Sequence, residues 1–156
     1  LSLHDALPIY EVQAILWRKS RQCITTGAKA RLETNQIKEE SMPVIHTHVS
    51  VSTTPEQREA LKAAYGRAIT AVPGKSEGWL MCPFEDNMPI YFGGSDDQPA
   101  AYVEVNVFGR SVPSSAWEKL TQNIMAALNS TLGVPEDRTY IRYTATTDWG
   151  WNGGNF

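Results

Sequence analysis

His46 and His48 are separated by one residue, a spacing that places two imidazoles on the same side of an extended chain. The surrounding segment "PVIHTHVSV", residues 43–51, alternates in the way that a half-buried strand does. Imidazole binds transition metals, but a metal site of this kind needs a third or fourth ligand. No other histidine follows residue 42, so the sequence predicts neither a metal site nor a cofactor here.

The two cysteines, Cys23 and Cys82, are too few for a disulfide framework or a four-cysteine metal site, and this usage suits a reducing compartment. A formal charge of −3 offers no basic surface, so we expect no nucleic-acid partner. No apolar run approaches the roughly 20 residues of a membrane helix, and we expect no membrane insertion. The 42% apolar and 20% charged residues are ordinary for a globular domain.

The pair Met42–Pro43 stands directly before the alternating segment. A proline is permitted at the first residue of a strand, so Pro43 needs no chemical role to explain its position. A methionine placed just before a regular pattern also suggests that a domain starts here. Residues 43–156 are long enough to form one domain with a buried core.

A helix is predicted within "TTPEQREALKAAYGRAITAV", residues 53–72. Thr54 fits the N-cap, Pro55 the first helical position, and Gln57 completes a capping box. Pro73-Gly74 ends the helix. Its apolar stripe consists of Leu61, Ala64, Tyr65, Ala68, Ile69 and Val72.

The same order of elements follows in the second half of the chain. A strand is predicted within residues 78–86, a short strand with a glycine turn within 87–99, and a long strand within 100–109. A second helix over 114–133 is expected to use Ser115 and Glu118 as its capping box and to end at Gly133. The last long strand is "TYIRYTAT", residues 139–146, before the aromatic tail "DWGWNGGNF".

These elements make one unit written twice. Pro73 and Trp79 in the first copy correspond to Pro135 and Tyr140 in the second. Two βαβ units predict an α/β (α+β) fold, a four-stranded mixed sheet with both helices on one face. The opposite face is semi-polar and aromatic, which favours coverage by other subunits, so we expect an oligomer.

Residues 43–156 resemble the macrophage migration inhibitory factor family of the tautomerase superfamily. The resemblance rests on five segments in order, which are "MPVIHTHVSV", "PGK" at 73–75, "FGGS" at 92–95, "PEDRTYIRY" at 135–143 and "GWNGGNF" at 150–156. It implies a homotrimer of tautomerase fold, without a cofactor, whose sites lie between subunits.

The resemblance implies that Pro43 is the catalytic general base once Met42 has been removed. A free proline nitrogen is a secondary amine that accepts a proton, and an α-amino group has a pKa near ~7.7–8.0. An apolar pocket and nearby cations lower that pKa toward neutrality, as proton abstraction beside a carbonyl requires. While Met42 remains attached, the nitrogen is an amide and cannot act as a base.

The resemblance also implies a set of substrate-binding residues. Lys75 would hold a substrate carboxylate, although a solvated turn lysine is the commoner state of this residue type. Phe108 would contribute its backbone N–H, and Tyr140 would come from a neighbouring subunit, unless it is simply a packing aromatic. The remaining members are Val44, Arg142, Trp151 and Phe156.

Two positions depart from the family pattern. Arg142 stands where many relatives carry asparagine; its guanidinium would bind a carboxylate bidentately, which affects specificity. The stretch "AAYV", beginning at Ala100, replaces a Cys-x-x-Cys found in some members, so we expect no thiol–disulfide activity.

Residues 1–42 have no lasting apolar period and no apolar region of a signal peptide. The segment "LSLHDALPI", residues 1–9, resembles a translated sequencing-library adapter, and residues 10–41 then read as translated upstream sequence. We therefore expect residues 1–42 to be a non-native or disordered leader, and the gene product to begin at Met42. A genuine but poorly ordered extension is the alternative.

The function expected from the resemblance is a keto–enol tautomerase, acting on phenylpyruvate-like acids and isomerising dopachrome. The alternative is a secreted cytokine-like ligand that binds a cell-surface receptor and has an incidental pocket. A third interpretation is a non-catalytic trimer in which Pro43 stays acylated. Without a signal peptide, the expected location is cytoplasmic, extracellular by unconventional secretion, or both.

Overall fold

The computed structural model describes residues 42–155 and builds them from two βαβ units. The first unit consists of β1 (Pro43–Val49), α2 (Pro55–Ala68) and β2 (Phe84–Glu85). The second consists of β3 (Ala101–Phe108), α3 (Ser114–Leu132) and β4 (Thr139–Thr146). Short 3₁₀ turns lie at Ile69–Ala71, Glu77–Trp79 and Glu136–Arg138. The predicted repeat is therefore confirmed.

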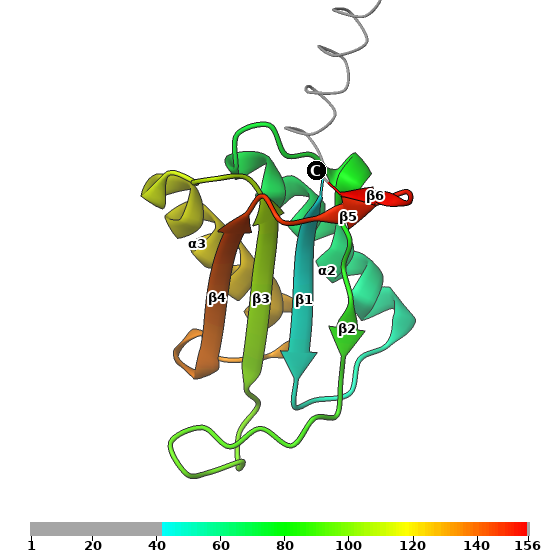
Figure 1. The fold of residues 1–156 in the computed structure, drawn as a ribbon. Coiled ribbons are helices and arrows are strands. Elements are labelled where there is room, and N and C mark those ends of the chain that lie inside the picture. Colours follow the sequence, from blue (N-terminus) through cyan, green and yellow to red (C-terminus); the bar gives the residue numbers. More distant parts are fainter. Residues whose placement is uncertain (1–41, 156) are drawn as a thin grey trace, which may run out of the picture. The chain divides into compact units, whose positions relative to one another are not determined.

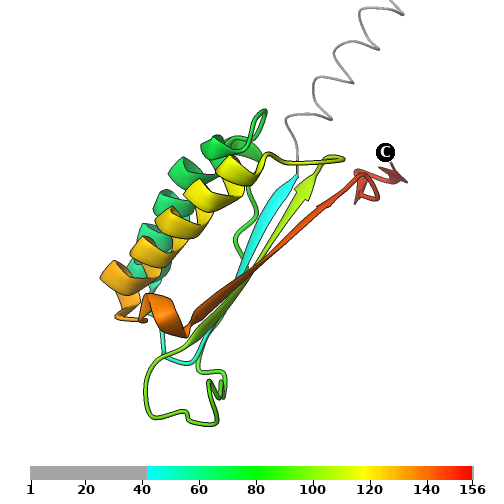
Figure 2. The ribbon, with the colours of Figure 1, turned by 90° about the vertical axis from the view of Figure 1, so that its left-hand side faces the viewer.

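The strands form a mixed sheet in the order β2-β1-β3-β4 (Figure 1). β1 and β3 are antiparallel at the centre, while β2 runs parallel to β1 and β4 parallel to β3. Both helices cover the same face of the sheet, and the opposite face carries no helix of residues 42–155 (Figure 2). The predicted fold class is confirmed.

Alternation along the strands decides which side chains meet the helices. In β1, Ile45, Thr47 and Val49 are buried, and the residues between them are half-buried. β3 repeats this pattern with Ala101, Val103, Val105 and Val107 on the buried side. Leu61 and Tyr65 of α2 and Leu120, Ile124 and Leu128 of α3 pack against that side. The apolar stripes of the helices supply the core as predicted.

Helix α2 begins as the sequence predicts. The Thr54 side chain accepts a hydrogen bond from the Gln57 backbone, and the Gln57 side chain accepts one from the Thr54 backbone, at 3.2 Å and 2.9 Å. The capping box therefore satisfies two backbone donors that the first helical turn leaves unpaired.

The predicted capping box of the second helix is wrong. Helix α3 begins at Ser114 with Pro113 as its N-cap, and no side chain caps it. Ser115 lies inside the first turn, where its hydroxyl is no longer at the capping position. Gly133 ends the helix in the left-handed conformation, at φ 68°, as expected.

The strand predicted within residues 78–86 is only partly present. Glu77–Trp79 forms a 3₁₀ turn, and only Phe84–Glu85 is regular strand. The segment still follows β1, because Ile45 donates to the Met81 carbonyl at 2.9 Å and Thr47 to the Pro83 carbonyl at 3.0 Å. Pro83 has no N–H to donate in return, which interrupts the ladder.

The remaining loop and tail are short hairpins. Phe92 and Ser95 pair across Gly93 and Gly94, which confirms the predicted glycine turn. The short strand predicted within residues 87–99 is wrong, because this isolated bridge is the extent of the pairing there. After β4, the tail forms β5 (Gly150–Trp151) and β6 (Gly154–Asn155). Over the part of the chain that the structure describes, no helix has the length and apolarity to cross a bilayer.

Candidate active site

Lys75 lies in the turn that follows α2, and its side chain is buried. Gly74 adopts a positive φ of 72°, and the Lys75 N–H donates to the Val72 carbonyl at 3.1 Å, which closes the turn. Only 7% of Lys75 is exposed. The alternative interpretation of Lys75 as a solvated turn lysine is therefore wrong.

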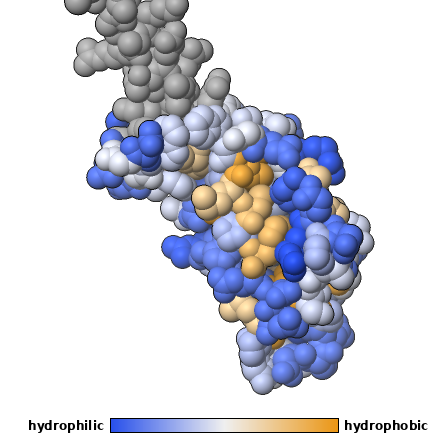
Figure 3. Space-filling model, turned by 90° about the vertical axis from the view of Figure 1, so that its right-hand side faces the viewer, coloured by the Kyte–Doolittle hydropathy of each residue, from blue (hydrophilic) through white to orange (hydrophobic). Residues whose placement is uncertain are grey.

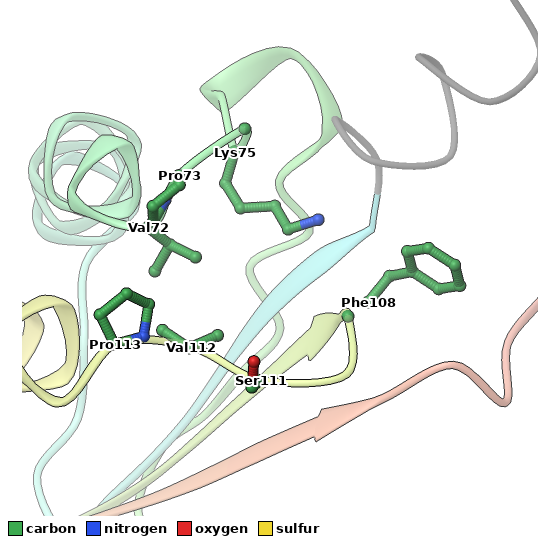
Figure 4. A pocket seen from close by; sticks show the side chains of 9 residues that line it. Val72, Pro73, Lys75, Phe108, Ser111, Val112 and Pro113 are labelled. Carbon is green, nitrogen blue, oxygen red and sulfur yellow. The ribbon is translucent and has the colours of Figure 1, made fainter. Parts of the chain in front are cut away.

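The Lys75 ammonium points toward the end of β3. Its Nζ lies 5.7 Å from the centre of the Phe108 ring (Figure 4). An ammonium at this distance is attracted by the ring's negative face. Two of the predicted site residues, from the α2 turn and from β3, are therefore brought together.

A cavity of about 480 Å³ opens beside these two residues. It lies between the turn after α2 and the connection from β3 to α3, and Figure 4 shows its lining. The lining consists of Val72, Pro73, Gly74, Lys75, Phe108, Gly109, Ser111, Val112 and Pro113. Apolar walls around one buried cation form a suitable environment for a small anion with an apolar body.

Pro43 begins β1 and is buried opposite Val107 of β3. Its carbonyl accepts a hydrogen bond from Met81 at 3.0 Å. Met42 is 8% exposed and adopts a left-handed φ of 68°. The Phe108 N–H donates to the Met42 carbonyl oxygen at 3.3 Å. The Met42–Pro43 bond therefore adjoins the backbone group predicted to contact substrate.

Pro43 and Val44 also line a second cavity, of about 380 Å³, together with Trp151. Trp79 and Trp149 are further aromatic members of its wall. The rings of Trp79 and Trp151 meet edge to face, with centres 5.4 Å apart. Trp79 was missed as a site residue, although the repeat singled it out as the counterpart of Tyr140.

Tyr140 and Arg142 lie away from Pro43 within one chain. Tyr140 of β4 lies opposite Tyr102 of β3, whereas Pro43 of β1 lies opposite Val107 of β3. Five residue steps along the strand separate the two levels, or ~17 Å. The Tyr140 side chain is 65% exposed and its ring lies 5.2 Å from that of Phe92. One chain therefore does not bring Tyr140 to Pro43.

Arg142 contacts an acidic neighbour on the helix-free face. Its Nη1 lies 3.7 Å from Oε1 of Glu104, and its side chain is 68% exposed. The remaining predicted site residue, Phe156, lies outside the described residues.

Cys82 is half-buried in the segment beside β1. Burial, followed by the charge of Glu77, raises the pKa of its thiol to about 11. Its thiolate is therefore scarce at neutral pH, which gives it little nucleophilic character.

Comparison with solved structures identifies the relatives of this fold. The Leishmania major protein MIF2 is 42% identical, with a TM-score of 0.68, over 74% of this chain and 98% of that protein. The chain belongs to the macrophage migration inhibitory factor family. No protein-family model and no curated protein matches the sequence.

Other members of the macrophage migration inhibitory factor family match a similar share of the chain. The Toxoplasma gondii factor is 29% identical over 72% of this chain and 99% of its own, with a TM-score of 0.66. A homologue from Prochlorococcus marinus is 26% identical over 72% of this chain and 98% of its own, with a TM-score of 0.63. This chain thus covers nearly the whole length of each of these relatives.

Proposed function

We propose that this chain is a keto–enol tautomerase of phenylpyruvate-like 2-oxo acids, in which Pro43 is the base after removal of Met42. The Pro43 nitrogen takes a proton from the carbon beside the carbonyl, and the protonated nitrogen returns a proton to the carbonyl oxygen, directly or through water, which gives the enol and restores the free amine. The reverse transfers regenerate the keto acid. The reaction is an isomerisation and consumes no co-reactant.

The observation that carries the proposal is the buried Lys75 ammonium at the mouth of an apolar cavity. A lysine ammonium attracts a carboxylate and donates charge-assisted hydrogen bonds to it. A 2-oxo acid offers a carboxylate for Lys75 and an apolar side chain for the cavity walls. Family membership supports the same substrate class, and a protein of the same fold has been crystallised after inactivation by 2-oxo-3-pentynoate.

The hydrogen bond from Phe108 to Met42 fits this role. Removal of Met42 takes away the acceptor of the Phe108 N–H and turns the Pro43 nitrogen into an amine. The same cleavage would thus create the base and allow a substrate to take the place of the Met42 carbonyl.

A homotrimer would supply the two residues that lie far from Pro43. The proposed sites contain Tyr140, Arg142 or both from a neighbouring copy, because one chain keeps Tyr140 ~17 Å along the sheet. An apolar patch on the side where β2 is the edge strand offers surface for such an assembly (Figure 3). Met81, in the segment before β2, is an exposed large apolar residue, at 63%.

The test is the enol–keto conversion of phenylpyruvate by protein that starts at Pro43, beside Pro43→Gly. We expect the variant to lose ~10²–10⁴-fold in kcat/KM, the usual contribution of a general base. Equal rates would refute the proline-base mechanism. Receptor binding that survives the substitution would instead favour a cytokine-like ligand.

A further inference from the structure

Three side chains on the helix-free face converge at the β1–β2 edge. His48 of β1 pairs with Glu85 of β2, and His46 precedes it by two residues on the same face. His46 Nε2 lies 2.9 Å from Oε1 of Glu85, and His48 Nδ1 lies 3.6 Å from Oε2. One carboxylate therefore faces two imidazole nitrogens, and all three ligand atoms lie within 4.8 Å of one another.

A thioether completes this group. Met88 Sδ lies 3.3 Å from His48 Nδ1. The imidazole rings of His46 and His48 are held with their centres 4.1 Å apart, and the Tyr102 ring stacks on His48 at 5.7 Å. Tyr102 is itself fixed by donating a hydrogen bond to Glu104 at 2.8 Å. The two imidazoles are thus packed in place before any ligand arrives.

The nitrogen of His46 shows that this is more than a simple ion pair. His46 Nε2 is shielded from solvent, yet among the described residues it has no hydrogen bond of acceptable alignment. Glu85 lies close enough for one, at 2.9 Å, but not in line. A neutral imidazole nitrogen and a carboxylate oxygen can both donate an electron pair to a metal ion.

The separations agree with ligation of one ion. Nitrogen and oxygen ligands bind Zn²⁺ at 2.0–2.2 Å, so tetrahedral ligand atoms lie ~3.3 Å apart. The two nitrogen–oxygen contacts, 2.9 Å to Oε1 and 3.6 Å to Oε2 of Glu85, lie on either side of this value. The Glu85 side chain is 52% exposed, which leaves a path for an ion to enter.

We propose that His46, His48 and Glu85, with Met88 beside them, form a binding site for a transition-metal ion of the imidazole-preferring class, Zn²⁺ or Cu²⁺. Imidazole nitrogens disfavour Mg²⁺ and Ca²⁺, which take oxygen ligands. The third ligand that the sequence pattern lacked is supplied by the parallel pairing of β1 with β2. This site is separate from the proposed chemistry at Pro43.

Calorimetric titration of the purified full chain with ZnCl₂ and with CuCl₂ tests the site. We expect one ion per chain, tighter binding of Cu²⁺ than of Zn²⁺, and no saturable binding of MgCl₂. His46→Gln and His48→Gln should each weaken Zn²⁺ binding at least ~10-fold. Glu85→Gln should also weaken it, and because Glu85 is half-exposed this variant keeps the test valid if a histidine variant fails to fold.

Two control variants separate the site from other donors. His4→Gln removes the third histidine of the chain, and Glu118→Gln removes an exposed carboxylate of helix α3, outside the proposed site. Both should bind Zn²⁺ as the unchanged chain does. The proposal is overturned if the unchanged chain does not bind saturably. It is equally overturned if His46→Gln, His48→Gln and Glu85→Gln leave the affinity intact, or if only His4→Gln removes it.

Discussion

The backbone N–H of Phe108 donates a hydrogen bond to the carbonyl oxygen of Met42, with 3.3 Å between nitrogen and oxygen. This contact joins the end of β3 to the residue that precedes β1. In the proposed mechanism this N–H contacts the substrate, so Met42 would occupy its place, and the Met42–Pro43 peptide bond makes the Pro43 nitrogen an amide.

Removal of Met42 should therefore switch on tautomerisation. We expect protein that starts at Pro43 to convert phenylpyruvate ~10²–10⁴-fold faster than protein that retains Met42, because only the former has a free amine. Initial rates of both forms, with masses checked on the intact chains, measure the effect. Comparable activity of the two forms would contradict this role of the amine.

Lys75→Ala should weaken substrate binding. The lost ion pair with a substrate carboxylate is worth roughly 1.5–3 kcal/mol, or ~10–100-fold in kcat/KM, and we expect most of it in KM. Lys75→Arg should recover part of the loss because it keeps the charge. Lys62→Ala, at an exposed lysine of α2, is the matched control, and an unchanged KM in Lys75→Ala would argue against carboxylate binding.

Activity should be recoverable from two inactive variants if Tyr140 acts on a neighbour's Pro43. Pro43→Gly and Tyr140→Ala, refolded together, would give mixed trimers in which about one site in four has both residues intact. Each variant refolded alone should remain weak. A mixture no more active than its parts would place both residues in the site of one chain, or would exclude Tyr140 from the site.

The hydroxyls of Tyr65 and Thr47 form a hydrogen bond in the core, at 3.1 Å, where both residues are 0% exposed. Tyr65→Phe should lower the free energy of unfolding by about 1–3 kcal/mol, because it leaves the Thr47 hydroxyl unpaired. Thr47→Val should lower the free energy of unfolding much less in the Tyr65→Phe variant than in the unchanged chain. Urea unfolding of the four proteins gives the coupling, and additive losses would contradict it.

Asp86 should contribute a pH-dependent part of the stability. Hydrogen bonds from the Thr53 backbone and hydroxyl, both 2.8 Å, hold the pKa of the Asp86 carboxyl below its ordinary 3.8. A lowered pKa stabilises the fold above pH 3.8 and loses its effect as the pH falls through the folded value. The stability gap between the unchanged chain and Asp86→Asn should thus shrink from pH 6 toward pH 2.

Melting temperatures across this pH range measure the gap. Asp96→Asn, at an exposed aspartate of the loop before β3, is the control for the change in net charge. A gap for Asp86→Asn that stays constant with pH would mean that the carboxylate charge does not contribute.

Local patterns were sufficient for most of the fold. The alternation of β1 and β3 predicted their buried sides, and Thr54 with Gln57 predicted the start of α2. The start of α3 was predicted correctly but its capping box was not, because Pro113 takes the N-cap position without any side-chain bond. The strand after Trp79 was predicted too long, because the pattern of apolar residues does not reveal that Pro83 interrupts the hydrogen bonding with β1.

Sequence by itself determined the two βαβ units and the sides of the strands, because side-chain periodicity and helix caps depend on neighbours a few residues away. Only the tertiary structure decided that Lys75 is buried against Phe108, that Tyr140 lies far from Pro43, and that Glu85 meets His46 and His48. Those relationships follow from strand register and from the packing of distant segments. A pattern read along one strand does not contain the register of its partner.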